Sequence, residues 1–280
     1  MIQDIYPSSL DNSFKVCQPK GSDSFLAFDG SGRLLASTGG DLRFPDGDML
    51  GMPDAVYLFS VDDRAYFLVQ QEIQTPDGYG SFTVRELRDR SGGIDSCRTE
   101  LFAAFTAYHL WRWYSDTRFC GRCGGRMSHS ENERAMRCAC GNVVYPRINP
   151  AVIVGVINGG SILITRYRMG YRHNALVAGF TEIGETLEQT VEREVYEETG
   201  IHVKNIRYYK SQPWGIAADI LTGYYCEVDG DDTIHMDPSE LKYAEWVERN
   251  EIELQPYPYS LTNEMMQMFR DGHVHAVSEE

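Results

Sequence analysis

The amino-acid sequence predicts an α+β protein with a mostly β N-terminal domain, a short cysteine-rich segment and a C-terminal domain of strands and helices. Strand-like alternation fills the first part of the chain, two cysteine pairs follow, and the remainder alternates apolar strand-like runs with amphipathic helical runs. We therefore divide the chain into an N-terminal domain (1–94), a linking helix (95–116), a zinc ribbon (117–146) and a C-terminal domain (147–275).

The composition is that of a folded globular protein. The chain has 280 residues, 42% of them hydrophobic, which is enough for two domains that each bury a core. A net charge of -15 disfavours broad binding to nucleic-acid backbones, and no DNA partner is expected. A polyanionic substrate would instead have to be met by bound metal and selected arginines.

The sequence gives no sign of a secretory signal or a membrane span. Residues 1–16 have neither a basic start nor a long apolar run, and no later stretch approaches membrane-spanning length. A soluble cytoplasmic protein is therefore expected. In that reducing compartment the seven cysteines favour metal ligands or free thiols over disulfides.

The N-terminal domain is predicted from two strand pairs. SFLAFDGSGRLLAS alternates around an Asp29-Gly30 turn signal, and AVYLFSVDDRAYFLVQQE alternates around Asp62-Asp63. Near the end of this domain, SFTVREL places Arg85 in a strand-like run, where a surface salt bridge is its ordinary role. Residues 96–115 then have the broad apolar face of a helix.

Two cysteine pairs predict a structural zinc site. The pairs are C-x2-C and C-x-C, with 14 residues between them, and thiolates on two tight knuckles can fill the corners of a tetrahedron. The glycines that follow each pair, Gly124 and Gly141, suit sharp turns. An unmetallated remnant and a redox pair are the alternatives. The four expected ligands are Cys120, Cys123, Cys138 and Cys140.

The second knuckle has one residue between its cysteines where the usual ribbon has two, so its turn geometry must differ. The three other cysteines, Cys17, Cys97 and Cys226, stand alone in the sequence. We expect them to be buried small apolar residues.

The C-terminal domain opens with a strong hairpin signal, in which INPAVIV and SILITRYR flank an Asn158-Gly159-Gly160 turn. NALVAGF leads into a helix, and VKNIRYYKSQPW and DILTGYYCEV are expected to be further strands of the same sheet. YAEWVERNEIELQ predicts a strand and turn, and LTNEMMQMFR a closing helix.

The most informative stretch runs from Gly179 to Ile201 and has the pattern G-x5-E-x7-R-E-U-x-E-E-x-G-U, where U is apolar. Thr186 and Gln189 have the spacing of a capping box at a helix start, and Gly200 supplies the stop. The apolar residues recur every four positions, which predicts one stripe that packs on a sheet. These residues are Leu187, Val191 and Val195.

The opposite face of this helix gathers three acids. Glu194, Glu197 and Glu198 lie at i, i+3 and i+4, so their carboxylates are neighbours and repel one another. Hard divalent cations relieve such repulsion, whereas the alternative is a solvated acidic face. The additional fixed positions Glu185 and Arg193 favour the metal, with Arg193 bracing the loop or the acids through bidentate hydrogen bonds.

This segment resembles the Nudix box, the signature of hydrolases that cleave a nucleoside diphosphate linked to another moiety. The resemblance implies an α/β/α sandwich with a mixed sheet, and Mg²⁺ or Mn²⁺ held against a pyrophosphate. It implies Glu194 and Glu198 as metal ligands, Glu197 as a ligand or a base that orients water, and the carbonyl of Ala178 as a further ligand. Arg193 belongs to the same catalytic group.

The wider pattern resembles the NADH pyrophosphatase branch of Nudix hydrolases. It covers residues 85–270 in order: V-R-E-L, the ribbon, Y-P-R-I, L-V-A-G-F, the box, S-Q-P-W and D-P-S-E-L. The resemblance implies hydrolysis of NADH or NAD⁺ to nicotinamide mononucleotide and AMP. It also implies a homodimer whose active site is completed across the interface, and it admits removal of NAD caps from RNA 5′ ends.

The same resemblance implies residue roles. Phe180 and Tyr145 would sandwich the adenine, although core or hairpin packing is the ordinary role of such rings. Arg85 and Glu133 would contact substrate, and Glu240 would join the metal site, although a surface glutamate there is ordinary. The remaining substrate-binding residues would be Gln212, Pro213, Trp214, Gly215, Ile216, Ala217, Ala218, Asp219 and Thr262.

The stretch after Trp214 departs from the family, whose longer motif continues as Pro-Phe-Pro-x-x-Ser, because this chain has GIAAD there. A broader hydrolase of dinucleotides or nucleoside-diphosphate sugars such as ADP-ribose is therefore the alternative enzyme. A third alternative is a regulatory protein that only senses nucleotide, although such a protein has no need of three adjacent acids.

Overall fold

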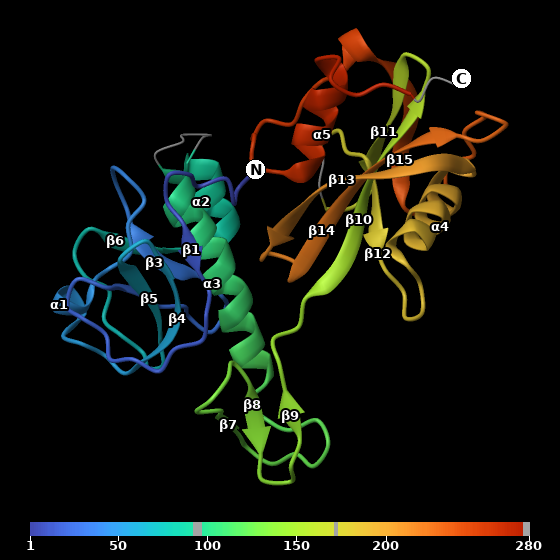
Figure 1. Ribbon diagram of the computed structural model, residues 1–280. Helices are drawn as coiled ribbons and strands as arrows, with labels where there is room; N and C mark the ends of the chain where they lie inside the picture. The colour runs from blue at the N-terminus through green and yellow to red at the C-terminus, as the bar shows by residue number, and fades with distance from the viewer. Residues whose placement is uncertain (92–96, 171–172, 277–280) are drawn as a thin grey trace. The chain divides into compact units, whose positions relative to one another are not determined.

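The structure is a computed structural model that describes residues 1–91, 97–170 and 173–276 (Figure 1). The chain divides into two compact units, and each is described by itself. The first comprises residues 2–148 and 214–218, and the second comprises Met1, residues 149–213 and residues 219–280. None of the described helices combines the length and the apolar character needed to cross a membrane.

A four-stranded sheet forms the centre of the first unit, in the order β1-β4-β5-β2. The antiparallel pair β4/β5 turns at Asp62, which has a positive φ of 51°, so the turn predicted at Asp62-Asp63 is confirmed. Strand β2 adds to β5 in parallel. The bounds are β1 Leu10–Asp11, β2 Ser24–Leu26, β4 Ala55–Val61 and β5 Arg64–Val69.

A second, two-stranded sheet pairs β3 (Leu34–Ser37) with β6 (Tyr79–Phe82), and α1 (Gly47–Leu50) is a single short turn. The predicted linking helix is α3, Arg98–Asp116, whose Leu101 and Phe105 are fully buried. The first residue expected for it, Ser96, and the boundary at 94/95 lie outside the described residues.

The strand-like interpretation of the segment around Arg85 was wrong, because Val84–Ser91 is a helix, α2. Thr83 and Glu86 cap it reciprocally: the Glu86 amide donates to Thr83 Oγ1 at 3.1 Å, and the Thr83 amide donates to the Glu86 carboxylate at 2.7 Å. This capping box overrides the β-branched residues of TVREL. Arg85 is exposed and forms no ion pair with any described residue, so the expected salt bridge is absent too.

The cysteine-rich segment forms three short strands, β7 (Met127–His129), β8 (Met136–Cys138) and β9 (Val143–Val144). Arg134, in the loop between β7 and β8, attaches the segment to the N-terminal sheet. Its guanidinium donates to the carbonyls of Leu58 in β4 and Asn12, and to the Asn12 side chain at 2.8 Å. The ribbon and the N-terminal sheet are thus one unit.

The second unit contains a six-stranded mixed sheet in the order β13-β14-β10-β11-β15, with β12 also paired to β10. Strands β10 and β14 run parallel over nine residue pairs, whereas β10 pairs antiparallel with β11 and β12. The predicted hairpin and strands are therefore confirmed. The bounds are β10 Asn149–Asn158, β11 Ser161–Tyr167, β12 Val177–Phe180, β13 Val203–Trp214, β14 Asp219–Val228 and β15 Leu241–Glu248.

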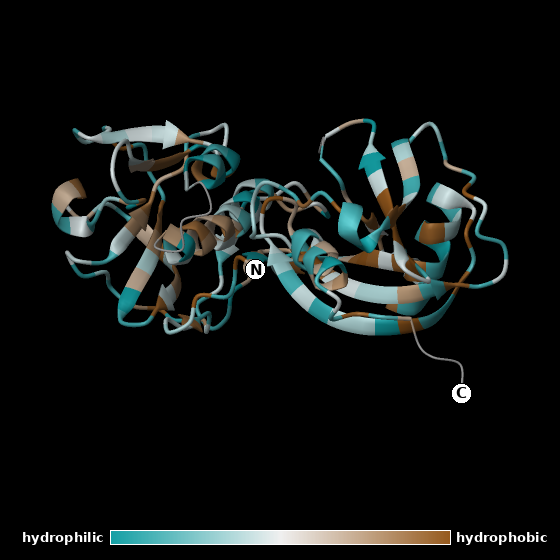
Figure 2. Ribbon diagram, turned by 90° about the horizontal axis from the view of Figure 1, so that it is seen from above, coloured by the Kyte–Doolittle hydropathy of each residue, from teal (hydrophilic) through white to brown (hydrophobic). Residues whose placement is uncertain are grey.

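Alternation along β10 makes both faces of this sheet apolar. Val152 and Val154 point to the face covered by α4 (Leu187–Thr199), while Ile153 and Ile157 point to the face covered by α5 (Leu261–Arg270). Figure 2 marks the hydrophobic segments on these strands. The result is the α/β/α sandwich expected from the sequence, and a 3-10 turn, η2 (Arg249–Glu251), follows β15.

Candidate active site

The box helix α4 begins and ends where the sequence predicts. Thr186 Oγ1 accepts from the Gln189 amide at 3.3 Å, Gln189 Oε1 accepts from the Thr186 amide at 2.9 Å, and Gly200 takes a left-handed φ of 72°. Val191 and Val195 are fully buried in the sheet core. The acidic face is therefore fixed by a helix that cannot rotate without exposing its apolar stripe.

The first residue of the box, Gly179, lies directly against the Glu194 carboxylate. A Cβ placed on it would lie 1.9 Å from the carboxyl carbon of Glu194, a distance that real structures do not show. Any other residue at this position would therefore displace the Glu194 carboxylate.

Arg193 fastens the box loop to the acids. Its Nε and Nη2 donate to the two oxygens of Glu185 at 2.6 and 3.0 Å, which is the bidentate bracing expected from the sequence. Nη1 donates to Glu194 at 2.8 Å and Glu197 at 3.0 Å, and Nη2 also reaches the Phe180 carbonyl at 2.9 Å. The hydrogen bond from Arg193 lowers the pKa of Glu185 to about 2.

Glu198 is buried, and its partner is a residue that the sequence did not reveal. The hydroxyl of Tyr167, the last residue of β11, lies 3.0 Å from Glu198 Oε1 and 3.2 Å from the Ala178 carbonyl, and it accepts from the Ala178 amide at 2.9 Å. Burial raises the pKa of Glu198 to about 8, and repulsion from Glu194 and Glu240 adds to the increase. Burial likewise raises the pKa of Glu194.

A β-bulge places Tyr167 and Glu240 at this site. Arg166 pairs with Tyr243 but Tyr167 pairs with Leu241, so β15 has one extra residue, and the Arg168 amide then donates to the Glu240 carbonyl at 2.9 Å. No local sequence pattern specifies a register shift between distant strands. The likeness to a family motif was the only signal for Glu240, and there was none for Tyr167.

The carboxylates suit a hard cation chemically. Glu198 is 2% exposed, and its pKa is raised by burial and by neighbouring acids, whereas a cation among the acids would favour their charged forms. Among the described residues, only the cysteine cluster has three or more ligand atoms within 4.8 Å of one another. Glu194 and Glu198 accept hydrogen bonds from Arg193 and Tyr167, which orient their carboxylates.

The four cysteines of the ribbon converge despite the shortened second knuckle. Their Sγ atoms all lie within 4.8 Å of one another, with Cys120–Cys140 at 3.7 Å and Cys123–Cys138 at 3.5 Å. Tetrahedral zinc with bonds of about 2.3 Å needs sulfur separations of about 3.8 Å, which these distances approach. Hydrogen bonds from two backbone amides lower the pKa of Cys120 to about 6, toward the thiolate that binds metal.

The turns of the ribbon are as predicted, since Gly124 and Gly141 have φ values of 72° and 85°. Among the isolated cysteines, Cys97 and Cys226 are buried as expected. The expectation for Cys17 was wrong, because its side chain is exposed in the irregular segment after β1. A lone cysteine outside a periodic segment carries no signal of burial.

Two of the expected substrate contacts meet within the ribbon. Tyr145 donates to the Glu133 carboxylate at 3.1 Å, and Arg137 pairs with the same carboxylate. The Tyr145 ring is 55% exposed, so its face is available for stacking. Phe180, which ends β12 in the other unit, is 53% exposed.

The stretch from Gln212 to Asp219 is engaged inside the protein. The Gln212 amide is fully buried, donating to the Tyr259 carbonyl and accepting from the Leu261 amide, both at 2.7 Å, so it holds the start of the helix that carries Thr262. Trp214 packs edge-on against Phe105 at 5.2 Å. A Cβ on Gly215 would lie 2.0 Å from the Phe105 carbonyl oxygen, so glycine is required there.

The remainder of the stretch turns back into the sheet. Pro213 lies in β13, residues 215–218 form the turn with Ala218 at a positive φ of 63°, and Asp219 is buried at the start of β14. Ile216 and Ala217 are half-buried within this turn.

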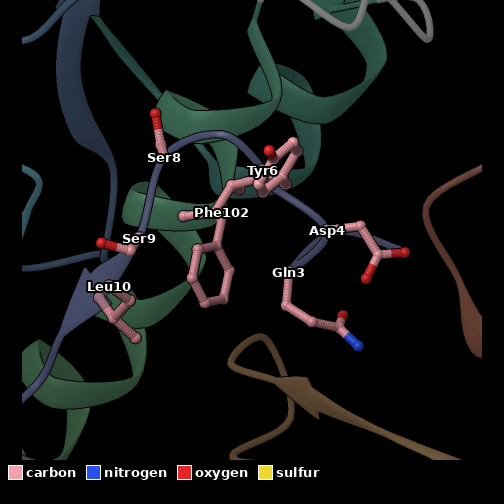
Figure 3. A pocket seen from close by; sticks show the side chains of 8 residues that line it. Gln3, Asp4, Tyr6, Ser8, Ser9, Leu10 and Phe102 are labelled. Carbon is pink, nitrogen blue, oxygen red and sulfur yellow. The ribbon is translucent and has the colours of Figure 1, made fainter.

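A cavity of about 470 Å³ lies under the N-terminal segment (Figure 3). Gln3, Ser9 and Phe102 are among its eight lining residues, and Asp4 is the one acid. Its lining includes no second acid and no histidine, so it does not offer the pair of titratable groups that acid–base catalysis commonly uses.

The comparisons agree with this site. Residues 147–268 match the NUDIX domain, and residues 115–145 match the NADH pyrophosphatase zinc ribbon domain. A protein of Enterobacter sp. (strain 638) named NAD-capped RNA hydrolase NudC is 35% identical over 79% of this chain and 81% of its own length. A protein of the same name from Escherichia coli O9:H4 (strain HS) is 37% identical over 72% of this chain and 75% of its own.

Among solved structures, a NUDIX hydrolase from Nitrosomonas europaea covers 56% of this chain and 92% of its own at 19% identity, with a TM-score of 0.49. The sandwich and its acid-bearing helix define the protein as a Nudix hydrolase. With its four-cysteine ribbon, the chain belongs to the NADH pyrophosphatase family of Nudix hydrolases.

Proposed function

We propose that the protein hydrolyses the pyrophosphate bond of NADH or NAD⁺ to nicotinamide mononucleotide and AMP. The observation that supports this most is the acidic face of α4. Glu194 is half-buried there, and Glu198 is buried and shares the Tyr167 hydroxyl with the Ala178 carbonyl. A stable fold gains nothing from burying mutually repelling carboxylates, whereas a diphosphate with its counter-cations requires them. Relatives that carry both the ribbon and the NUDIX domain support the substrate class.

The acids have separate roles in this proposal. Glu194, Glu198, the Ala178 carbonyl and Glu240 hold Mg²⁺ or Mn²⁺, with Glu197 as a further ligand or as the base. A divalent cation, when bound, neutralises phosphate charge and lowers the pKa of a bound water. Glu197 is 58% exposed, and among the residues that the structure describes its carboxylate is bound by Arg193 alone, so it can turn to accept the proton of the attacking water.

Two exposed aromatic side chains are the proposed contacts for the adenine of the substrate. Phe180 and Tyr145 present free ring faces that can stack on adenine, with Glu133 and Arg85 as polar contacts. The stretch from Gln212 to Asp219, with Thr262, supports the pocket. We place the zinc in a structural role because four thiolates fill its coordination. A cytoplasmic homodimer with its site completed across the interface completes the proposal.

Removal of NAD caps from RNA 5′ ends is a second candidate, because the relatives are named for it and the same bond is broken. A broader hydrolase acting on ADP-ribose is the alternative, because residues 215–219 depart from the family motif.

Turnover of NADH, ADP-ribose and diadenosine diphosphate, measured side by side with Mg²⁺ or Mn²⁺, tests the specificity. We expect NADH to have the highest kcat/KM because the nicotinamide half supplies binding energy that the other two substrates lack. Equal values on all three would defeat the NADH assignment and favour the broader hydrolase. The kcat/KM values for NAD⁺ and NAD-capped RNA, measured in the same series, show which of these substrates the protein prefers.

A further inference from the structure

The first knuckle of the ribbon presents two arginines and an aromatic ring side by side. Phe119 and Arg126 are antiparallel bridge partners, and the Met127 amide donates to the Arg118 carbonyl at 3.0 Å. The knuckle between these two arms carries Cys120 and Cys123 of the thiol cluster. The relative positions of Arg118, Phe119 and Arg126 are therefore fixed by paired backbone.

These three side chains line one wall of a cleft of about 1110 Å³ within the first unit. Trp111 and Tyr114 of α3 line another wall, and Phe28 stacks on Trp111 with ring centroids 5.1 Å apart. Small-molecule pockets are typically about 300–1,000 Å³, so the cleft has room for more than one nucleotide. Its lining residues all belong to the first unit, whereas the acids of α4 belong to the second.

The charges on this wall differ from those of the whole chain, whose net charge is -15. Arg118 donates to the Ser115 carbonyl, and neither it nor Arg126 forms an ion pair with a carboxylate of the described residues. Of the acids in the cleft, Asp116 lies 3.8 Å from Arg112, and Asp29 accepts backbone hydrogen bonds within its own turn. Glu72 is the remaining carboxylate.

The exposed ring of Phe119 adds a stacking surface to the two arginines. Phe119 is 65% exposed and lies in the same cleft wall as the two arginines. Single-stranded RNA is held by cations that follow its backbone and by aromatic rings on which successive bases stack. An acidic peptide would use the arginines but would leave the ring without a planar partner.

We propose that this cleft binds the single-stranded RNA that follows the 5′ cap, with Arg118 and Arg126 on phosphates and Phe119 stacked on a base. The inference rests on the proposed function insofar as NAD-capped RNA is a substrate. It assigns the ribbon a binding role in addition to its structural one. Free NADH has no RNA chain and does not use the cleft.

The test measures binding of a short, uncapped, fluorescently labelled single-stranded RNA to the full-length protein by anisotropy across a salt series. In the Arg118→Gln/Arg126→Gln double variant, the slope of log K against log salt should fall by about 1.4, since each contact with a single strand contributes roughly 0.7. Phe119→Ala should weaken binding roughly 5- to 100-fold. Phe119→Leu keeps an apolar residue and tests stacking if the alanine variant does not fold.

The matched control is Arg43→Gln/Arg64→Gln, which removes the same charge from exposed positions of the same unit outside the cleft. Zinc content and NADH turnover are measured for every variant. We expect only the cleft variants to lose RNA affinity, with NADH turnover unchanged. Equal losses in the control, unchanged RNA affinity in the cleft variants, or no RNA binding by the wild-type protein would overturn the proposal. Absent NADH turnover in the wild-type protein would instead count against the proposed function.

Discussion

The thiol cluster of the ribbon and the carboxylates of the box helix are both suited to metals, yet they are organised in opposite ways. The four sulfurs lie within 4.8 Å of one another. The carboxylates of Glu194 and Glu198 are instead held by Arg193 and Tyr167. Soft thiolates on short knuckles suit a closed structural site, whereas we propose that the hard carboxylates form an open site for a divalent cation.

The strongest loss is expected when one cysteine ligand of the ribbon is removed. Cys140→Ser removes one of four ligands, and zinc binding in small zinc domains is worth roughly 10–16 kcal/mol, so the ribbon should lose its zinc and its fold. Metal analysis of the purified variant and circular dichroism measure this. Cys17→Ser, which alters an exposed cysteine outside the cluster, is the control and should retain the zinc. A Cys140→Ser variant that still carries one zinc per chain would show that the cluster is not a four-ligand site.

The next strongest loss is expected when the carboxylates of α4 are replaced by amides. Glu197→Gln removes the proposed base and Glu198→Gln a proposed ligand, and each should lower kcat for NADH by roughly 10²- to 10⁴-fold. Glu192→Gln, at an exposed position of the same helix outside the acid set, should leave kcat unchanged.

Thermal melting separates chemistry from folding in this series. Glu198 is a buried acid whose pKa is raised to about 8, so a neutral amide there should not lower the melting temperature. Hydrolysis that persists undiminished in both variants would remove the box from the mechanism.

The weakest loss is expected from Tyr167, because this residue holds the proposed metal ligand Glu198 and is not itself a ligand. Tyr167→Phe removes the hydroxyl that bridges Glu198 and the Ala178 carbonyl, and should weaken Mn²⁺ binding about 10- to 100-fold. Calorimetric titration with Mn²⁺ measures this without turnover. Tyr243→Phe, which loses a hydroxyl bound to Glu245, is the control. Unchanged Mn²⁺ affinity in Tyr167→Phe would limit the tyrosine to packing.

Local features of the molecule could be predicted from the sequence. The capping box at Thr186 and the stop at Gly200 specify α4, because each involves neighbours within one helical turn. The same kind of signal was present at Thr83 and Glu86 and was missed, because the β-branched residues around Arg85 favoured a strand. A strong capping pair should therefore outweigh weak β propensity.

Parts of the candidate site depend on contacts between distant segments. The bulge opposite Tyr167 requires a strand register that no short pattern specifies. The hydrogen bond from Arg134 to the Leu58 carbonyl and the packing of Trp214 on Phe105 each join residues more than 70 positions apart. Gln212 is an example of the difference. Its sequence motif gave no sign that its buried side-chain amide holds the start of α5.

The amino-acid sequence was enough to predict a Nudix hydrolase with a zinc ribbon. The spacing of acids along one helix and of cysteines on two knuckles is a short-range property of the chain. Which acid is buried, which tyrosine holds it and which carboxylate lies against Gly179 became clear from the folded structure alone. The physical reason is that burial, close approach and strand register arise when segments far apart in the chain pack together.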